Sequence, residues 1–229
     1  MTFQTLFVKA HEFGTICAIK IPGGEPSERD IARLHPQEAQ ALSRFKMSRR
    51  STWVGGRLAL AQACEALDES FRPILNDERG APVLPTGLTG TLTHKNNIAI
   101  SLVAHSKRSM RLGIDVEAIS LRQQSIEKMI LTDAELTKLS TIASDRRQEF
   151  VVSRFSLKES IYKAIDPFVK RYVGFKEVEI HETNEGFEAR FKLKNNEGPF
   201  AVELRSERLL VDAEEFVVTS ARVTHLVDV

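Results

Sequence analysis

The chain has 229 residues, 42% of them hydrophobic and 28% charged, which is ordinary for one large globular domain or two small ones. Its 32 basic and 31 acidic residues nearly cancel, so the net charge indicates neither nucleic acid nor a membrane surface as partner. No apolar run could form a transmembrane helix, and the N-terminus lacks the apolar core of a signal peptide. We therefore expect a cytoplasmic protein. Cys17 and Cys64 have no metal-ligand spacing, and both a disulfide and a free thiol pair remain open.

The first half of the chain predicts helices between strands. A β-branched run indicates the first strand, and Pro22-Gly23-Gly24 ends it. Ser27 and Pro36 are typical of helix starts, and apolar residues at helical spacing after Ser48 predict a long amphipathic helix. The expected elements are a strand over 13–21, a short helix after Ser27, helices over 36–47 and 48–67, a loop over 76–87, and strands over 88–92, 98–103 and 112–117.

The second half predicts two helices followed by an antiparallel meander. Thr132-Asp133-Ala134-Glu135 is a capping box, and the turn signals Asn184-Glu185-Gly186 and Asn195-Asn196-Glu197-Gly198 separate later segments. The expected elements are helices over 132–144 and 146–165, and strands over 173–181, 187–193, 200–205 and 216–223. Because helices and antiparallel strands occur in both halves, the pattern permits two similar lobes, which we place at 1–110 and 111–229.

Two carboxylates lie on one face of the strand Gly113-Ile114-Asp115-Val116-Glu117. Side chains alternate on a strand, so Asp115 and Glu117 point the same way, about 6–7 Å apart along it. A hard cation with oxygen ligands can bridge such a pair. The alternative is a half-exposed strand with a solvated acidic face.

A third carboxylate stands on the second of these helices. Phe155, Glu159 and Lys163 recur every four residues and share one face, which Lys158 and Tyr162 border. The alternative is a Glu–Lys pair at the surface. Three carboxylates with nearby ammonium groups are the groups a protein needs to hold a divalent metal against a polyphosphate.

Further cations and one histidine could bind phosphate. The segment 44–57 holds five cations and no acid, and arginine side chains match the geometry of phosphate oxygens. The alternative is a helix face that is exposed to solvent. Arg79 follows in the predicted loop, and His94 ends the run Gly90-Thr91-Leu92-Thr93. The five cations are Arg44, Lys46, Arg49, Arg50 and Arg57.

Taken together, these motifs resemble the 4′-phosphopantetheinyl transferase superfamily. The order of Gly-Ile-Asp-Val-Glu at 113–117 and Phe-Ser-Leu-Lys-Glu-Ser-Ile-Tyr-Lys at 155–163 fits its signature. Arg49-Arg50, Gly56-Arg57, the run 80–85 and the run 90–94 agree with the surfactin-type and enterobactin-type branch. The resemblance covers about residues 44 to 165 and departs from the usual pattern at Phe155, Leu84 and Thr93, where Trp, Trp and Ser are frequent.

The resemblance implies an α+β fold of two similar lobes in a pseudo-twofold arrangement, each with helices packed on an antiparallel sheet. It implies a monomer with its active site in the cleft between the lobes. Coenzyme A would donate its 4′-phosphopantetheine arm to a serine of an apo-carrier protein (acyl, peptidyl or aryl), releasing 3′,5′-ADP. The carrier would serve fatty acid, polyketide or nonribosomal peptide synthesis, including secondary metabolites and siderophores.

The resemblance also assigns roles to residues. Asp115, Glu117 and Glu159 would bind Mg²⁺, with Mn²⁺ indistinguishable by ligand type. Lys158 and Lys163 would add positive charge at the pyrophosphate, and Glu159 or a metal-bound water would accept the serine proton. The positions expected to bind coenzyme A are Arg50, Arg57, Arg79, Thr93, His94, Lys158 and Lys163.

Two other functions use the same residues. A Mg²⁺-dependent phosphohydrolase would transfer a nucleotide or pyrophosphate phosphoryl group to water instead of to a carrier protein. A non-catalytic coenzyme A-binding module would tolerate replacement of Asp115 or Glu159. The presence of all three carboxylates and both lysines favours the transferase, and the sequence leaves the particular carrier protein open.

Overall fold

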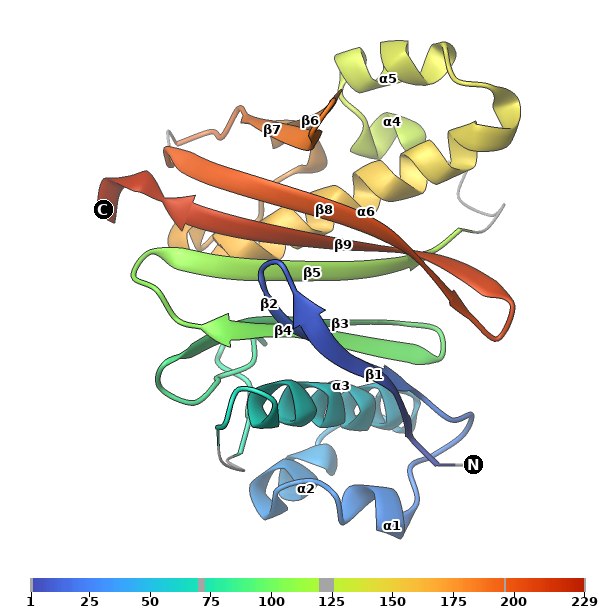
Figure 1. Cartoon of the computed structure of the whole chain (residues 1–229), viewed down its shortest axis with the longest axis vertical. Helices are drawn as coiled ribbons and strands as arrows, with labels where there is room; N and C mark the ends of the chain where they lie inside the picture. Colours follow the sequence, from blue (N-terminus) through green and yellow to red (C-terminus); the bar gives the residue numbers. More distant parts are fainter. Residues whose placement is uncertain (1, 70–72, 120–125, 196, 229) are drawn as a thin grey trace. The chain divides into compact units, whose positions relative to one another are not determined.

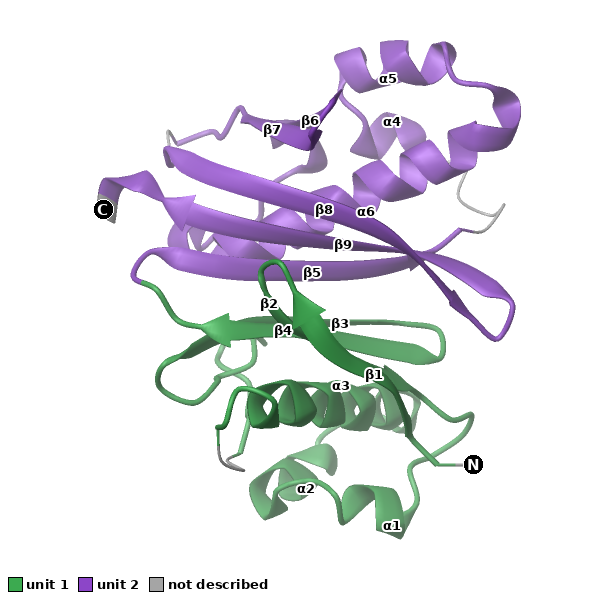
Figure 2. Cartoon of the chain, in the orientation of Figure 1, with its two compact units in different colours: residues 1–107 green, residues 108–229 purple. Residues whose placement is uncertain are grey.

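The computed structural model describes residues 2–69, 73–119, 126–195 and 197–228. It contains two compact units, residues 1–107 and 108–229 (Figure 2). We describe each unit by itself. Among the described residues, no helix combines the length and apolar character needed to cross a membrane.

Unit 1 is a four-stranded antiparallel sheet covered by helices (Figure 1). The strand order is β1-β2-β4-β3, and the longest helix, α3, packs on β2 and β4. Its elements are β1 Gln4–His11, β2 Gly14–Lys20, α1 Glu28–Ile31, α2 Pro36–Leu42, α3 Met47–Glu65, β3 Leu88–Lys95 and β4 Ile98–His105.

The core of unit 1 lies between α3 and the sheet. Val54 and Leu58 of α3 are buried with Ile19 and Val103 of the strands, so the apolar stripe predicted for this helix faces the sheet. Cys17 and Cys64 are both free and buried, so among the described residues they form no disulfide. Burial raises the pKa of each thiol to about 12.

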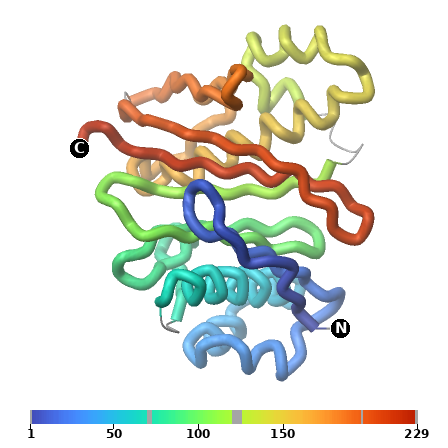
Figure 3. Tube along the Cα trace, viewed as in Figure 1, coloured from blue at the N-terminus to red at the C-terminus, as the bar shows by residue number. Residues whose placement is uncertain are grey.

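Unit 2 has a three-stranded antiparallel sheet of order β5-β9-β8, a separate hairpin β6-β7, and the long helix α6 (Figures 1 and 3). Helix α6 packs on β5 and β9. The elements are β5 Met110–Ala118, α4 Glu127–Ile130, α5 Asp133–Ser140, α6 Ser144–Val169, a 3-10 turn Phe175–Glu177, β6 Val178–Thr183, β7 Gly186–Phe191, β8 Phe200–Val211, β9 Glu214–His225 and a 3-10 turn Leu226–Asp228.

The predicted α+β class, with helices on antiparallel sheets in both halves, is confirmed. Ser27 caps α1 and the capping box at Thr132 begins α5, as predicted; Ser27 also forms a capping box with Asp30, which was not predicted. Strand β1 escaped prediction because it pairs with β2 on one side only, and its residues are mostly exposed, so no apolar alternation marks it. The helix predicted over 36–47 ends at Leu42, and the four-residue helix α4 was not predicted.

Candidate active site

The site in unit 2 is built where β5 meets α6, and Gly113 makes that approach possible. A Cβ atom at Gly113 would lie 1.7 Å from the backbone oxygen of Ser160, closer than any side chain can come. Only glycine lets the strand lie so near the helix. Asp115 and Glu117 follow at strand spacing on the same face, so they also point toward α6.

Asp115 and Glu117 are buried, at 5% and 8% exposure. Lys163 donates from Nζ to Asp115 Oδ1 at 2.8 Å and to the Ile114 carbonyl oxygen at 2.9 Å. The ammonium group therefore spans the gap between helix and strand. The alternative of a solvated acidic strand face is wrong, because these carboxylates lie in the interior beside a cation.

Glu159 stands one helical turn before Lys163 and shares its electrostatic surroundings. Burial raises the pKa of Glu159, the charges of Asp115 and Glu117 raise it further, and Lys163 lowers it. The three carboxylates therefore repel one another across the strand–helix contact. A buried hydrogen bond of 2.9 Å joins the hydroxyls of Ser156 and Thr219 and ties α6 to β9, the strand paired with β5.

The donor set suits a hard divalent cation. Carboxylate oxygens are the ligands that Mg²⁺ and Mn²⁺ prefer, and a cation among them would relieve the repulsion that raises the Glu159 pKa. Within the described ranges, however, no three carboxylate, histidine or cysteine side chains already form a group that could hold a metal ion. The residues fit the ion by chemistry, and here Lys163 supplies the positive charge at Asp115.

Lys158 does not join this group. Its side chain is fully buried, and Nζ donates to Glu135 Oε2 at 2.7 Å and to the Ile130 carbonyl oxygen at 2.8 Å. Consecutive helical residues point about 100° apart, so Lys158 projects from another side of α6 than Glu159. We predicted a pyrophosphate contact for Lys158, and the structure instead gives it a buried ion pair. We therefore withdraw it from the candidate site.

Glu135 is the residue that sequence reasoning missed. It was recognised only as the last member of a capping box, whose geometry is present. In the structure its carboxylate also accepts from the backbone N–H of Ile180 and pairs with Lys158. The signal available in the sequence was that Lys158 lies beside Leu157 and Ile161 on the apolar stripe of the helix, because an ammonium group buried there requires an anionic partner.

Two aromatic residues of α6 flank Glu159 on the helix and pack against the ring of Phe175. Phe155 and Tyr162 each contact the ring of Phe175, with centroids 5.5 and 5.6 Å apart, and the Tyr162 hydroxyl donates to the Gly174 carbonyl oxygen at 3.0 Å. This contact fixes the face of the helix that carries Glu159. The alternative that Glu159 and Lys163 form a simple surface pair is therefore wrong.

The two arginines of α3 that were expected to bind phosphate have different surroundings in unit 1. Arg57 is 2% exposed, its guanidinium lies 3.7 Å above the Trp53 ring, and it donates to Asn76 Oδ1. Burial lowers the pKa of Arg57 to about 10. Arg57 thus anchors the loop after α3 rather than offering its charge at the surface, which corrects its assignment as a phosphate contact. Arg50 is half-buried, and its Nε donates to the Phe45 carbonyl oxygen at 3.3 Å.

The other candidates of unit 1 lie on a loop and a strand. Arg79 is exposed in a turn in which its backbone N–H donates to Asp77 Oδ1 at 2.9 Å. Thr93 is buried on β3 and pairs with Ile100, while the neighbouring His94 is exposed and pairs with Ala99. These residues belong to unit 1 and the carboxylates to unit 2.

Comparison with known proteins gives consistent matches. A model described as "4'-phosphopantetheinyl transferase superfamily" matches residues 111–221, and one described as "4'-phosphopantetheinyl transferase N-terminal domain" matches residues 37–104. The 4'-phosphopantetheinyl transferase Npt of Nocardia iowensis is 31% identical over 148 residues, which are 65% of this chain and 66% of that protein. PptT of Mycobacterium tuberculosis is 29% identical, over 78% of this chain and 83% of its own length. A crystal structure of Thermotoga maritima holo-[acyl-carrier-protein] synthase is 25% identical with a TM-score of 0.41, over 50% of this chain and 62% of that one.

Proposed function

Since this chain belongs to the 4′-phosphopantetheinyl transferase superfamily, as its sequence motifs predicted, we propose that it transfers the 4′-phosphopantetheine arm of coenzyme A to a serine of an apo-carrier protein. The products are a holo-carrier protein and 3′,5′-ADP. The chain spans about two thirds of the length of Npt, so the activity is proposed here on the site's own residues as well.

One observation carries the proposal: two buried carboxylates of β5 face a lysine and a third carboxylate of α6. Asp115 and Lys163 are joined at 2.8 Å, and burial together with the charges of Asp115 and Glu117 raises the pKa of Glu159. Such a group binds a polyphosphate through a divalent cation and cannot bind it alone, because carboxylates repel phosphate. Lys163 can contact the polyphosphate directly when a divalent cation replaces its ammonium group at Asp115.

In this proposal Asp115, Glu117 and Glu159 hold Mg²⁺. When bound, Mg²⁺ neutralises the pyrophosphate and stabilises charge that grows in the transition state. Lys163 is 31% exposed and so can reach a phosphate oxygen while its stem stays against β5. Either Glu159 or a metal-bound water would accept the proton of the carrier serine.

We assign the nucleotide end of coenzyme A to unit 1. The exposed side chains of Arg79 and His94 can contact phosphate directly, and Arg50 is accessible in part. Thr93 offers a hydroxyl beside His94. Arg57 serves this group indirectly, by holding Asn76 at the start of the loop that carries Arg79.

The test is transfer itself. The protein is incubated with coenzyme A, Mg²⁺ and a panel of apo-carrier proteins from fatty acid, polyketide and nonribosomal peptide synthases, and each carrier is followed by intact mass. We expect at least one carrier to gain a single phosphopantetheine arm, and none to gain it with Asp115→Asn. Consumption of coenzyme A without any mass gain on a carrier would instead establish a phosphohydrolase.

A further inference from the structure

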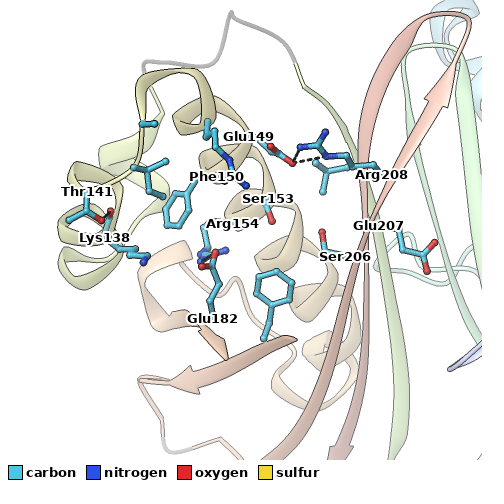
Figure 4. Close-up of a pocket in the computed structure, with 15 residues that line it drawn as sticks. Lys138, Thr141, Glu149, Phe150, Ser153, Arg154, Glu182, Ser206, Glu207 and Arg208 are labelled. Atoms are coloured by element: carbon cyan, nitrogen blue, oxygen red, sulfur yellow. Dashed lines mark hydrogen bonds and ion pairs between the residues drawn. The ribbon is translucent and has the colours of Figure 1, made fainter. Parts of the chain in front are cut away.

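A second site lies in unit 2, apart from the carboxylates. A cavity of about 570 Å³, partly open to solvent, is lined by residues of α5, the first half of α6, the β6-β7 hairpin and strands β8 and β9 (Figure 4). Its volume falls within the range of small-molecule sites, roughly 300–1,000 Å³. The residues of α6 that line it include Phe150 and Arg154. Glu159 is nine residues beyond Phe150, which is about 180° around the helix, so the cavity opens on the opposite face of α6.

Arg154 is the central polar group of this cavity. It is 2% exposed, and its guanidinium lies 4.2 Å from the ring centre of Phe150 and 5.5 Å from that of Phe187. One amino nitrogen donates to Glu182 Oε1 at 2.9 Å, while the buried Nε finds no acceptor among the described residues. A guanidinium held between two aromatic rings with a donor unused is prepared for a second oxygen ligand.

Glu182 is a replaceable partner for Arg154. Its side chain is 50% exposed, and it stands near the end of β6, beside the turn to β7 (Figure 4). Because Glu182 is half in water, it can leave Arg154 at small cost, whereas Arg154 cannot leave its aromatic neighbours. An external carboxylate could therefore take the place of the Glu182 carboxylate and also accept from Nε.

The charges around the cavity select a singly charged ligand. The lining includes the cations Lys138, Arg146, Arg154 and Arg208 and the carboxylates Glu149, Glu182 and Glu207. With four positive and three negative groups, the cavity favours one negative charge and disfavours a dianion such as phosphate. The N-terminal end of α6 also lines it through Ala143 and Arg146, although Asp145 in the same turn offsets part of the positive charge of this helix end.

We propose that this cavity binds a small organic carboxylate with an apolar body. The ligand's carboxylate displaces Glu182 from Arg154, and its body lies against Phe150, Phe187 and the partly buried Ile142. The binding is non-covalent and does not require the transferase reaction.

The probe is 3-phenylpropionate, with 3-phenylpropanamide as its uncharged match. Backbone amide NMR of the full chain is recorded while each probe is added. We expect 3-phenylpropionate to shift amides of 142–154 and 182–187 saturably, in the millimolar range, and the amide to bind at least about tenfold more weakly. No saturable shift, or equal binding of the two probes, overturns the proposal.

Two variants test the exchange with Glu182. Glu182→Gln removes the competing carboxylate and should tighten 3-phenylpropionate about three- to tenfold, whereas Glu188→Gln, which alters the exposed pair with Arg190 on the same hairpin, should change nothing. Arg154→Gln should abolish binding, if its amide spectrum remains that of a folded protein. If Arg154→Gln unfolds, Glu182→Gln still decides the test, because it changes a half-exposed side chain. An unchanged or weaker affinity in Glu182→Gln refutes the exchange.

Discussion

The buried pair Lys158–Glu135 gives the sharpest prediction, because it separates a residue that supports α6 from one that touches coenzyme A. Lys158 is 0% and Glu135 2% exposed in their side chains. Glu135 also accepts from the backbone N–H groups of Thr132 and Ile180, at 2.8 and 2.9 Å. The pair thus joins α5, α6 and β6 at one point.

Glu135→Ala leaves a buried ammonium group without its anion, and we expect it to cost about 3–5 kcal/mol of unfolding free energy. Lys158→Met removes the charge but fills a similar volume, and the remaining carboxylate keeps its two backbone donors. We expect a loss of about 1–3 kcal/mol for this variant. In the double variant, the loss of unfolding free energy should be smaller than the sum of the two single losses by about 0.5–3 kcal/mol. The reason is that each single change already removes the shared contact.

Urea unfolding followed by circular dichroism measures these values, and calorimetry measures coenzyme A binding at a temperature where every variant is folded. Folded Lys158→Met should bind coenzyme A with the affinity of the wild type, because the lysine faces Glu135. Additive losses of stability would show that the pair is not coupled. A large loss of coenzyme A affinity with unchanged stability would restore Lys158 as a pyrophosphate contact and refute our placement of it.

Other residues give shorter predictions. Gly113→Ala should destabilise unit 2 by about 1–3 kcal/mol or more in urea unfolding, since its Cβ would meet the Ser160 carbonyl oxygen at 1.7 Å; unchanged stability would mean that strand and helix are farther apart. Glu159 has a raised pKa in the folded protein, so the stability linked to its protonated form is present below its unfolded pKa and is lost as pH rises through the folded value. Glu159→Gln should therefore raise the melting temperature at about pH 7 and not at about pH 4, without metal; an equal change at both would refute the repulsion. Lys163→Ala should lower turnover strongly, with Lys163→Arg restoring it only in part, and wild-type kinetics would make it a purely structural partner of Asp115. His94→Ala should weaken coenzyme A more than dephospho-coenzyme A in calorimetry, and equal losses would exclude a contact with the 3′-phosphate.

Local patterns predicted most of the fold because each rests on neighbours in sequence. The capping box at Thr132 and the apolar stripe of α3 both form as predicted. Strand β1 could not be predicted, because an edge strand is defined by its pairing with β2 and not by its own burial. In the candidate site, too, local features were predictable and contacts between elements were not. Spacing alone put Glu159 and Lys163 on one face of a helix, and the structure adds that this face meets Asp115.

The errors at Arg57 and Lys158 have one physical origin. A sequence motif shows that a cation is present but not which way it points, and both residues sit in helices where neighbouring positions differ by about 100°. Each cation is buried and paired inside its own unit, Arg57 with Asn76 and Lys158 with Glu135. A buried charge requires such a partner, so both residues stabilise the helices on which more accessible charges stand. Lys163 differs because its Nζ reaches across to another element while the side chain stays 31% exposed. The motif lysine that can both hold the strand and meet a ligand is therefore Lys163.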